Sequence, residues 1–240
     1  MYLIILFILL LTACQSTLES RESLSKETQT KKKEENTMNQ QLIDCAERGD
    51  TKKVLNLLKD GAEINATNEH GVTAVMAATQ NHQTDTVHML IQQGADINIR
   101  NNNQDNVLLY AGAEGFLDIV KLAVEAGADT TLTNRYDGTA LIPASERGHV
   151  EVVKELLTHS DTDVNHINNL HWTALLEAII LGEGGKDHQK IVQLLVNHGA
   201  DVNISDGDGV TPLQHAQNHG YREIVGILKE AGAQPKAPTW

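Results

Sequence analysis

Aromatic side chains are scarce in this sequence. Phe, Trp and Tyr make up 3% of the 240 residues, with two Phe and two Trp in the whole chain. A conventional single-core globule buries large aromatic rings, whereas this chain is rich in Ala, Leu, Val, Ile, Asn and Gly. That composition favours small helices packed closely through Ala, and it makes internal repeats the first feature to look for.

An excess of basic residues is also lacking, because the formal net charge is −13. Residues 1–14 carry no charged side chain and residues 15–37 are neutral overall, so the whole excess of negative charge lies on residues 38–240. Such a surface repels phosphate backbones and offers no counterion release, which argues against nucleic acid as the main partner. A basic or dipolar protein partner fits better.

The signatures of common enzymes are missing as well. The sequence has no Gly-rich phosphate loop, no nucleophile elbow and no His-Glu-x-x-His motif. We therefore predict a protein that is not an enzyme and that needs no cofactor.

A metal site is the sharpest chemical alternative. His215 and His219 are four residues apart on one helix face, with His198 nearby in sequence, and two imidazoles so placed can hold a metal. No Cys or carboxylate is fixed beside the pair, so we interpret these His residues as surface and loop positions and predict no metal. The segment 206–209, Asp-Gly-Asp-Gly, lacks the remaining ligands of a calcium loop and is interpreted as a hairpin tip.

The N-terminus has the pattern of a targeting segment. The apolar run at 3–11 is far shorter than the roughly 20 residues of a membrane-spanning helix, but it has the length of a signal-peptide core. The residues Leu-Thr-Ala-Cys that end at Cys14 resemble the lipobox of bacterial lipoproteins. That resemblance implies removal of residues 1–13, lipidation of Cys14 and location at a bacterial cell membrane or outer membrane, lipid-anchored and extracytoplasmic. The alternative is translation from Met38, which would give a cytosolic adaptor.

Residues 15–37 are polar, mixed in charge and nearly free of branched apolar side chains. Such a segment buries too little apolar surface to order itself, so residues 14–37 are predicted to be the lipidated Cys and a disordered tether. As a flexible coil, this tether would reach roughly 25–30 Å. With Cys14 lipidated, Cys45 is the one thiol left, so no intramolecular disulfide can form.

From residue 38 onward the sequence repeats. One phrase recurs as Gly-Ala-Glu-Ile-Asn at 61–65, Gly-Ala-Asp-Ile-Asn at 94–98, Gly-Ala-Asp-Thr-Thr at 127–131 and Gly-Ala-Asp-Val-Asn at 199–203. A residue that can cap a helix opens each later unit, with spacings of 33, 33, 34 and 38 residues. These opening residues are Thr73, Asn106, Thr139, Thr173 and Thr211.

Each unit has the same internal order. An Ala five residues after the opening position, matched by Cys45 in the first unit, predicts close packing between neighbouring units. A Gly is predicted to end the first helix in a left-handed conformation, and His82 is the one departure. The predicted helix-ending glycines are Gly49, Gly115, Gly148, Gly182 and Gly220. A second helix follows, and then an extended turn with an Asn or Asp that bonds its own backbone. Those turn residues are Asn68, Asn101, Asn134, Asn168 and Asp206.

This order resembles the ankyrin repeat, and the resemblance covers about 200 of the 240 residues. It implies an all-α fold, an ankyrin-repeat solenoid of about six helix-turn-helix units with short β-hairpin loops. The predicted units of the domain at 38–240 lie near 38–70, 71–103, 104–136, 137–170, 171–208 and 209–240. The family's Thr-Pro-Leu-His opening survives only as Thr-Pro-Leu-Gln at 211–214, so the hydrogen bonds of that His must be missing or replaced.

The family resemblance also implies where a partner binds, because ankyrin proteins usually bind on the concave face of hairpin tips and first helices. In unit five, four of the five face positions are apolar, including one of two Trp residues. These side chains and two flanking residues of unit four form the predicted site, here called the apolar patch. Its members are Arg135, Tyr136, Leu170, Trp172, Ile180 and Leu181. In the alternative interpretation, the insertion at 183–187 folds back over the apolar side chains of unit five, Ile180 and Leu181 above all, and makes them local core.

The sequence thus predicts a membrane-anchored, non-enzymatic protein-protein interaction module. It would be a monomer that binds, stabilises or inhibits an exported partner protein.

Overall fold

The computed structural model describes residues 29 and 31–234, so the leader, Cys14 and most of the predicted tether lie outside the described residues. A helix through residues 31–47 comes first. The helices that follow are α2 (Thr51–Lys59), α3 (Ala74–Gln80), α4 (Thr84–Gln92), α5 (Val107–Glu114), α6 (Leu117–Glu125), α7 (Leu141–Glu146), α8 (Val150–His159), α9 (Ala174–Ile180), α10 (Lys186–Asn197), α11 (Pro212–Asn218) and α12 (Arg222–Glu230).

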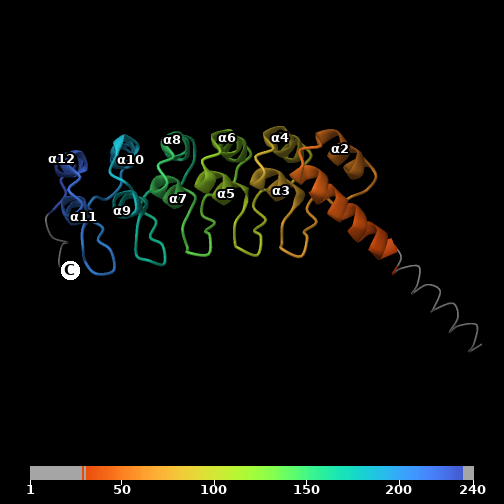
Figure 1. Ribbon diagram of the computed structural model, residues 1–240, viewed down its shortest axis with the longest axis horizontal. Coiled ribbons are helices and arrows are strands. Elements are labelled where there is room, and N and C mark those ends of the chain that lie inside the picture. Colours follow the sequence, from red (N-terminus) through yellow and green to blue (C-terminus); the bar gives the residue numbers. More distant parts are fainter. Residues whose placement is uncertain (1–28, 30, 235–240) are drawn as a thin grey trace, which may run out of the picture.

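The helices form two rows with a series of hairpin loops along one side (Figure 1). The first helices of the units make the row next to the loops, and they are α3, α5, α7, α9 and α11. The second helices make the outer row. Each first helix packs on its own second helix and on the first helices of the adjacent units. The predicted all-α solenoid is confirmed. Within the described residues the loops contain no regular strand, and the one bridge joins Thr67 to Thr73.

The helix at 31–47 corrects the predicted tether, because residues 31–37 are helical and not disordered. Leu42 and Ile43 are buried in the core, and they lie more than one helical turn after this stretch. Once those later turns are fixed by packing, each added residue costs little entropy and gains one backbone bond. The Lys, Glu and Asn side chains at 31–36 stay exposed, so low apolar content excluded burial of this stretch but not a helix.

Four of the five opening residues cap their helices as predicted. Thr73, Asn106, Thr173 and Thr211 each accept a hydrogen bond from the backbone N–H three residues later. Thr139 does not, and its buried hydroxyl has no partner within the described residues. In the other four units the residue four after the opener donates its N–H to the opener's carbonyl, but here that residue is Pro143, which has no N–H. The first turn is therefore distorted, and α7 begins only at Leu141.

The predicted left-handed glycines are correct at Gly49, Gly115, Gly148 and Gly220, with φ between 73° and 78°. His82 adopts the same conformation at φ 52°, and its ring stacks on Phe116 with centroids 3.9 Å apart. The prediction is wrong for Gly182, whose φ is not in the left-handed region. In this unit the inserted residues move the reversal to Gly184, at φ 64°.

The repeated Ala positions lie at the centre of the array. Each is completely buried, and Cys45 occupies the equivalent position with 1% exposure. The predicted close packing between units is therefore confirmed. The fully buried Ala side chains are Ala78, Ala111, Ala144, Ala178 and Ala216.

Asn and Asp side chains shape the loops and link them. In each loop the turn residue accepts N–H bonds from the residues two and four positions later, as Asn168 does from Leu170 and Trp172 at 2.9 and 3.0 Å. A second Asn connects consecutive units, as Asn65 does by accepting from the N–H of Asp96 at 2.9 Å. Because these bonds use the backbone of each loop, the side chains at the loop tips are left to face solvent.

Candidate functional site

Most of the apolar patch is exposed to solvent. Tyr136 is 53% exposed, Leu170 51% and Leu181 50%, while Trp172 and Ile180 are half-buried. Within the described residues there are four large apolar side chains that are exposed, and these three are among them. Large apolar side chains that gather on one part of a soluble protein often mark a binding surface.

The loop tips of units four and five are held together. The backbone N–H of Asn169 donates to the carbonyl of Tyr136 at 3.0 Å, and the ring of His166 contacts the carbonyl of Asp137 at 2.6 Å. Tyr136 and Leu170 are therefore neighbours on two joined tips. Arg135 lies over the Tyr136 ring, 4.8 Å from its centroid, which fixes both side chains beside the apolar residues.

The insertion at 183–187 does not cover the patch. Leu181 remains half exposed beside it, and Lys186 already belongs to α10, which the insertion lengthens at its start. The residues on either side of the segment bond to the adjacent units. Tyr221 of unit six donates its hydroxyl to the carbonyl of Gly182 at 2.9 Å, and the ring of His188 contacts the carbonyl of Glu146 in unit four at 2.9 Å. The alternative in which these residues become local core does not describe this structure.

The patch has two ends, because α9 separates its members. Leu170 and Trp172 precede the helix, whereas Ile180 is its last residue and Leu181 is its C-cap. Seven residues of helix span roughly 10 Å, so one bound segment running along α9 can touch both ends.

Ile167 belongs to the same loop and was missed by the sequence reasoning. It is 45% exposed, and it lies one residue before Asn168. Alignment of the repeats could have identified Ile167 as an exposed apolar residue, because the equivalent positions of the other loops are polar. Those equivalents are Thr67, Arg100, Thr133 and Ser205.

Glu177 lies between the two ends of the patch and is buried, with 4% of its surface exposed. Its Oε1 accepts a hydrogen bond from Asn168 Nδ2 at 2.8 Å, whereas its Oε2 has no partner within the described residues. Burial raises the pKa of Glu177 to about 7, and the negative charge of Glu146 adds to this, against the effect of the Asn168 bond. Glu177 therefore links the loop to the first helix in unit five.

His215 provides the same link in unit six. Its Nε2 lies 2.7 Å from Asp206 Oδ2, and Asp206 Oδ1 accepts N–H bonds from Asp208 and Val210. Burial acts to raise the pKa of Asp206, but the Val210 N–H and the other hydrogen bonds outweigh it and hold the pKa below its usual value. Asp206 is therefore engaged by its own unit, in a loop tip as predicted.

The other His residues of the candidate metal group do not join His215. His219 stacks on Tyr221 with centroids 5.1 Å apart, and His198 bonds the carbonyl of Leu194 at the end of α10. In the described part of the chain, no three His, Cys, Asp or Glu side chains are grouped to hold a metal ion. Among the same residues, no helix combines the length and apolar character that a membrane crossing requires.

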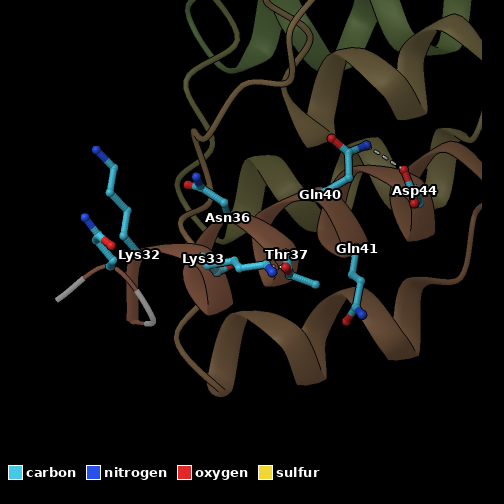
Figure 2. A pocket seen from close by; sticks show the side chains of 8 residues that line it. Lys32, Lys33, Asn36, Thr37, Gln40, Gln41 and Asp44 are labelled. Carbon is cyan, nitrogen blue, oxygen red and sulfur yellow. Dashed lines mark hydrogen bonds between the residues drawn. The ribbon is translucent and has the colours of Figure 1, made fainter. Parts of the chain in front are cut away.

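A shallow hollow lies along the N-terminal helix (Figure 2). Its lining side chains, such as Lys32, Asn36 and Gln40, come from that one helix and from Gln29 just before it. Gln40 donates to Asp44 at 2.8 Å along the same face. No second element of the described chain lines this hollow, which is an exposed helix face there.

Comparison with protein families decides what kind of array this is. The family model described as "Ankyrin repeats (3 copies)" matches residues 42–134, 114–206 and 141–239, which together cover most of the chain. The chain belongs to the ankyrin-repeat family. Ankyrin repeats are generally non-enzymatic modules that bind other proteins.

Solved ankyrin-repeat structures agree in fold. An ankyrin repeat domain from Acinetobacter baumannii AYE is 51% identical with a TM-score of 0.78, covering 80% of this chain and 98% of that one. The ankyrin repeat protein EF0377 is 39% identical with a TM-score of 0.76, over 79% and 96% of the two chains. Among curated proteins, the ankyrin repeat protein YahD of Escherichia coli K12 is 50% identical over 80 residues, which are 33% of this chain and 40% of YahD.

Proposed function

We propose that this ankyrin-repeat protein is a membrane-anchored, non-enzymatic module that binds an exported partner protein and stabilises or inhibits it. The observation that carries the binding part is the apolar patch. Three of the four exposed large apolar side chains in the described residues lie on the adjacent loops and first helix of units four and five. An apolar centre with Trp, Tyr and Arg beside it has the composition of an interface hot spot.

The partner test is a crosslinking pull-down from native membranes with the full chain. Leu170→Asp places a charge in the exposed patch without removing core volume, so we expect it to abolish recovery of the partner while the thermal unfolding midpoint is kept. Asn103→Asp makes the same kind of change at the equivalent tip of unit three and is the matched control. Equal recovery with both variants would show that the patch is not the binding site.

The anchor is the second part of the proposal, and it rests on the lipobox-like residues that end at Cys14. Cells expressing the full chain and fed radiolabelled palmitate should label the protein, and Cys14→Ser should remove the label. If the wild-type chain takes up no label, the anchor is wrong and the cytosolic adaptor translated from Met38 takes its place.

A further inference from the structure

A cavity of about 480 Å³ opens beside one end of the apolar patch. It lies between the turn that joins α7 to α8 and the insertion of unit five. Leu181 is the one large apolar side chain of its lining, beside the acidic residues Glu146, Glu183 and Asp187 and the basic residues Arg147 and Lys186. The cavity therefore combines one exposed apolar side chain with an excess of one carboxylate over Lys and Arg, at the place where the repeat pattern is interrupted.

Glu177 is a buried acidic residue close to this cavity, although it is not among the residues that line it. It lies one helical turn before Leu181, whose N–H donates to the Glu177 carbonyl at 3.1 Å. Glu146, on the cavity wall, is close enough for its negative charge to help raise the pKa of Glu177.

Arg147 and Lys186 line the cavity, but the basic side chains that the structure describes on this surface form no ion pair with Glu146 or Glu183. Arg147 binds Glu114 Oε1 at 2.7 Å and the carbonyl of Ala113 at 2.8 Å, on the side of unit three. Arg135 lies over Tyr136, and Lys190 pairs with Asp187 at 3.1 Å. Within the described residues, no Lys, Arg or His nitrogen lies within 4.0 Å of a carboxylate oxygen of Glu146, Glu177 or Glu183.

We propose that this cavity receives a Lys or Arg side chain of the partner protein, and that an apolar side chain next to it in the partner packs on Leu181. The inference rests on the proposed function, because it names the chemistry that the apolar patch recognises. A cationic donor would pair with the carboxylates of Glu146 and Glu183, and charge-assisted hydrogen bonds shielded from water are stronger than neutral ones. The net charge of −13 would also speed the encounter with a basic segment.

The test is selection of random linear peptides, displayed on phage, on the immobilised full chain purified in detergent. We expect the selected peptides to carry Lys or Arg beside an aliphatic or aromatic residue. A synthetic copy of a selected peptide should bind Glu146→Gln about tenfold more weakly than the wild type. Replacing the peptide's basic residue with norleucine should weaken binding to the wild type by a similar factor and have little further effect on Glu146→Gln, since the two changes remove one interaction.

Two variants keep this test independent of folding. Glu183→Gln changes an exposed residue of the insertion and should also weaken binding, while Glu125→Gln makes the same charge change on the outer helix α6 and should not. Thermal unfolding midpoints show whether each variant is folded.

The outcomes separate the inference from the proposed function. Peptides that depend on Leu170 or Leu181 but lack a basic residue, or that bind the two cavity Gln variants as tightly as the wild type, overturn the cationic inference and leave the binding function standing. If no selected peptide depends on Leu170 or Leu181, the apolar patch is not a binding surface and both proposals fail.

Discussion

Glu177 shows how one side chain can make stability depend on pH. Its pKa of about 7 in the folded chain lies above the value of 4.5 for an unperturbed Glu. Between these values the unfolded chain releases a proton that the folded chain keeps, so the free energy of unfolding falls as pH rises. The stability that protonated Glu177 contributes is therefore fully present below about pH 4.5 and is lost as pH rises through about 7.

Glu177→Gln should remove this dependence. Because Gln keeps the oxygen that accepts from Asn168 and carries no charge, we expect it to raise the free energy of unfolding at pH 8 by roughly 2 kcal/mol, with little effect at pH 4.5. Urea denaturation of wild type and variant at both pH values measures the difference. An effect of equal size at both values would mean that burial does not shift this carboxyl group.

The loop tips contain a second residue-scale feature, a left-handed position two residues before each opening residue. Gly71 and Gly209 fill it in two units, but Gln104 adopts it at φ 66°. Left-handed backbone costs a residue with a Cβ roughly 1–2 kcal/mol, against a smaller entropic cost for Gly. Gln104→Gly should therefore raise stability by about 0.5–1 kcal/mol, measured by chemical denaturation. Asn103→Gly, next to it and outside the left-handed region, should instead lower stability.

At the scale of the helix, unit four differs from the others because of one residue. Pro143 lacks the N–H that would close the first turn, so α7 has six residues and Thr139 does not act as a cap. The opening position was predictable from the repeat, but the loss of its capping role comes from a change in the first turn that Pro143 causes, four residues later.

Two matched substitutions test this difference. Thr73→Val removes a hydroxyl that caps α3 and should cost about 1 kcal/mol. Thr139→Val removes a buried hydroxyl without a partner and should be close to neutral. Both changes keep the shape of the side chain, so chemical denaturation compares the caps alone. Equal losses would mean that Thr139 caps α7 in solution.

The helix pairs could be predicted from the sequence, whereas the helix at 31–37 and the conformation of Gly182 could not. The recurring Ala, Gly and Asn positions predicted the helix pairs, because each unit repeats the same packing problem. The helix at 31–37 was missed because its stability comes from Leu42 and Ile43 further along, and the conformation of Gly182 was missed because the insertion moves the turn to Gly184. Both errors concern residues whose conformation is set by a neighbour and not by their own type.

At the scale of the whole molecule, each unit contacts mainly its neighbours, so stability should be distributed along the array. The candidate site could be located from sequence because unit five departs from the pattern at Leu170, Trp172, Ile180 and Leu181. The Asn168–Glu177 bond and the cavity beside Leu181 could not, because the bond depends on how the loop folds against α9 and the cavity on how units four and five lie against one another.

The link between units five and six gives a prediction at this scale. Tyr221→Phe removes the hydroxyl that bonds the carbonyl of Gly182 and keeps the ring, so we expect a loss of about 1 kcal/mol. Hydrogen exchange followed by mass spectrometry should show faster exchange in α11 and α12 and an unchanged rate in α3 to α6. Faster exchange throughout would mean that the array unfolds as a single unit.

The loops held by Asn and Asp side chains have a consequence for how such a protein can change over time. Each of these residues bonds the backbone around it. The residues that determine the shape of the loop are therefore different from the residues whose side chains face outward. Mutation can therefore exchange Tyr136, Ile167 or Leu170 for other residues while the loop keeps its form. A lineage that carries this scaffold can acquire new targets through a few tip substitutions, and a protein engineer can follow the same route.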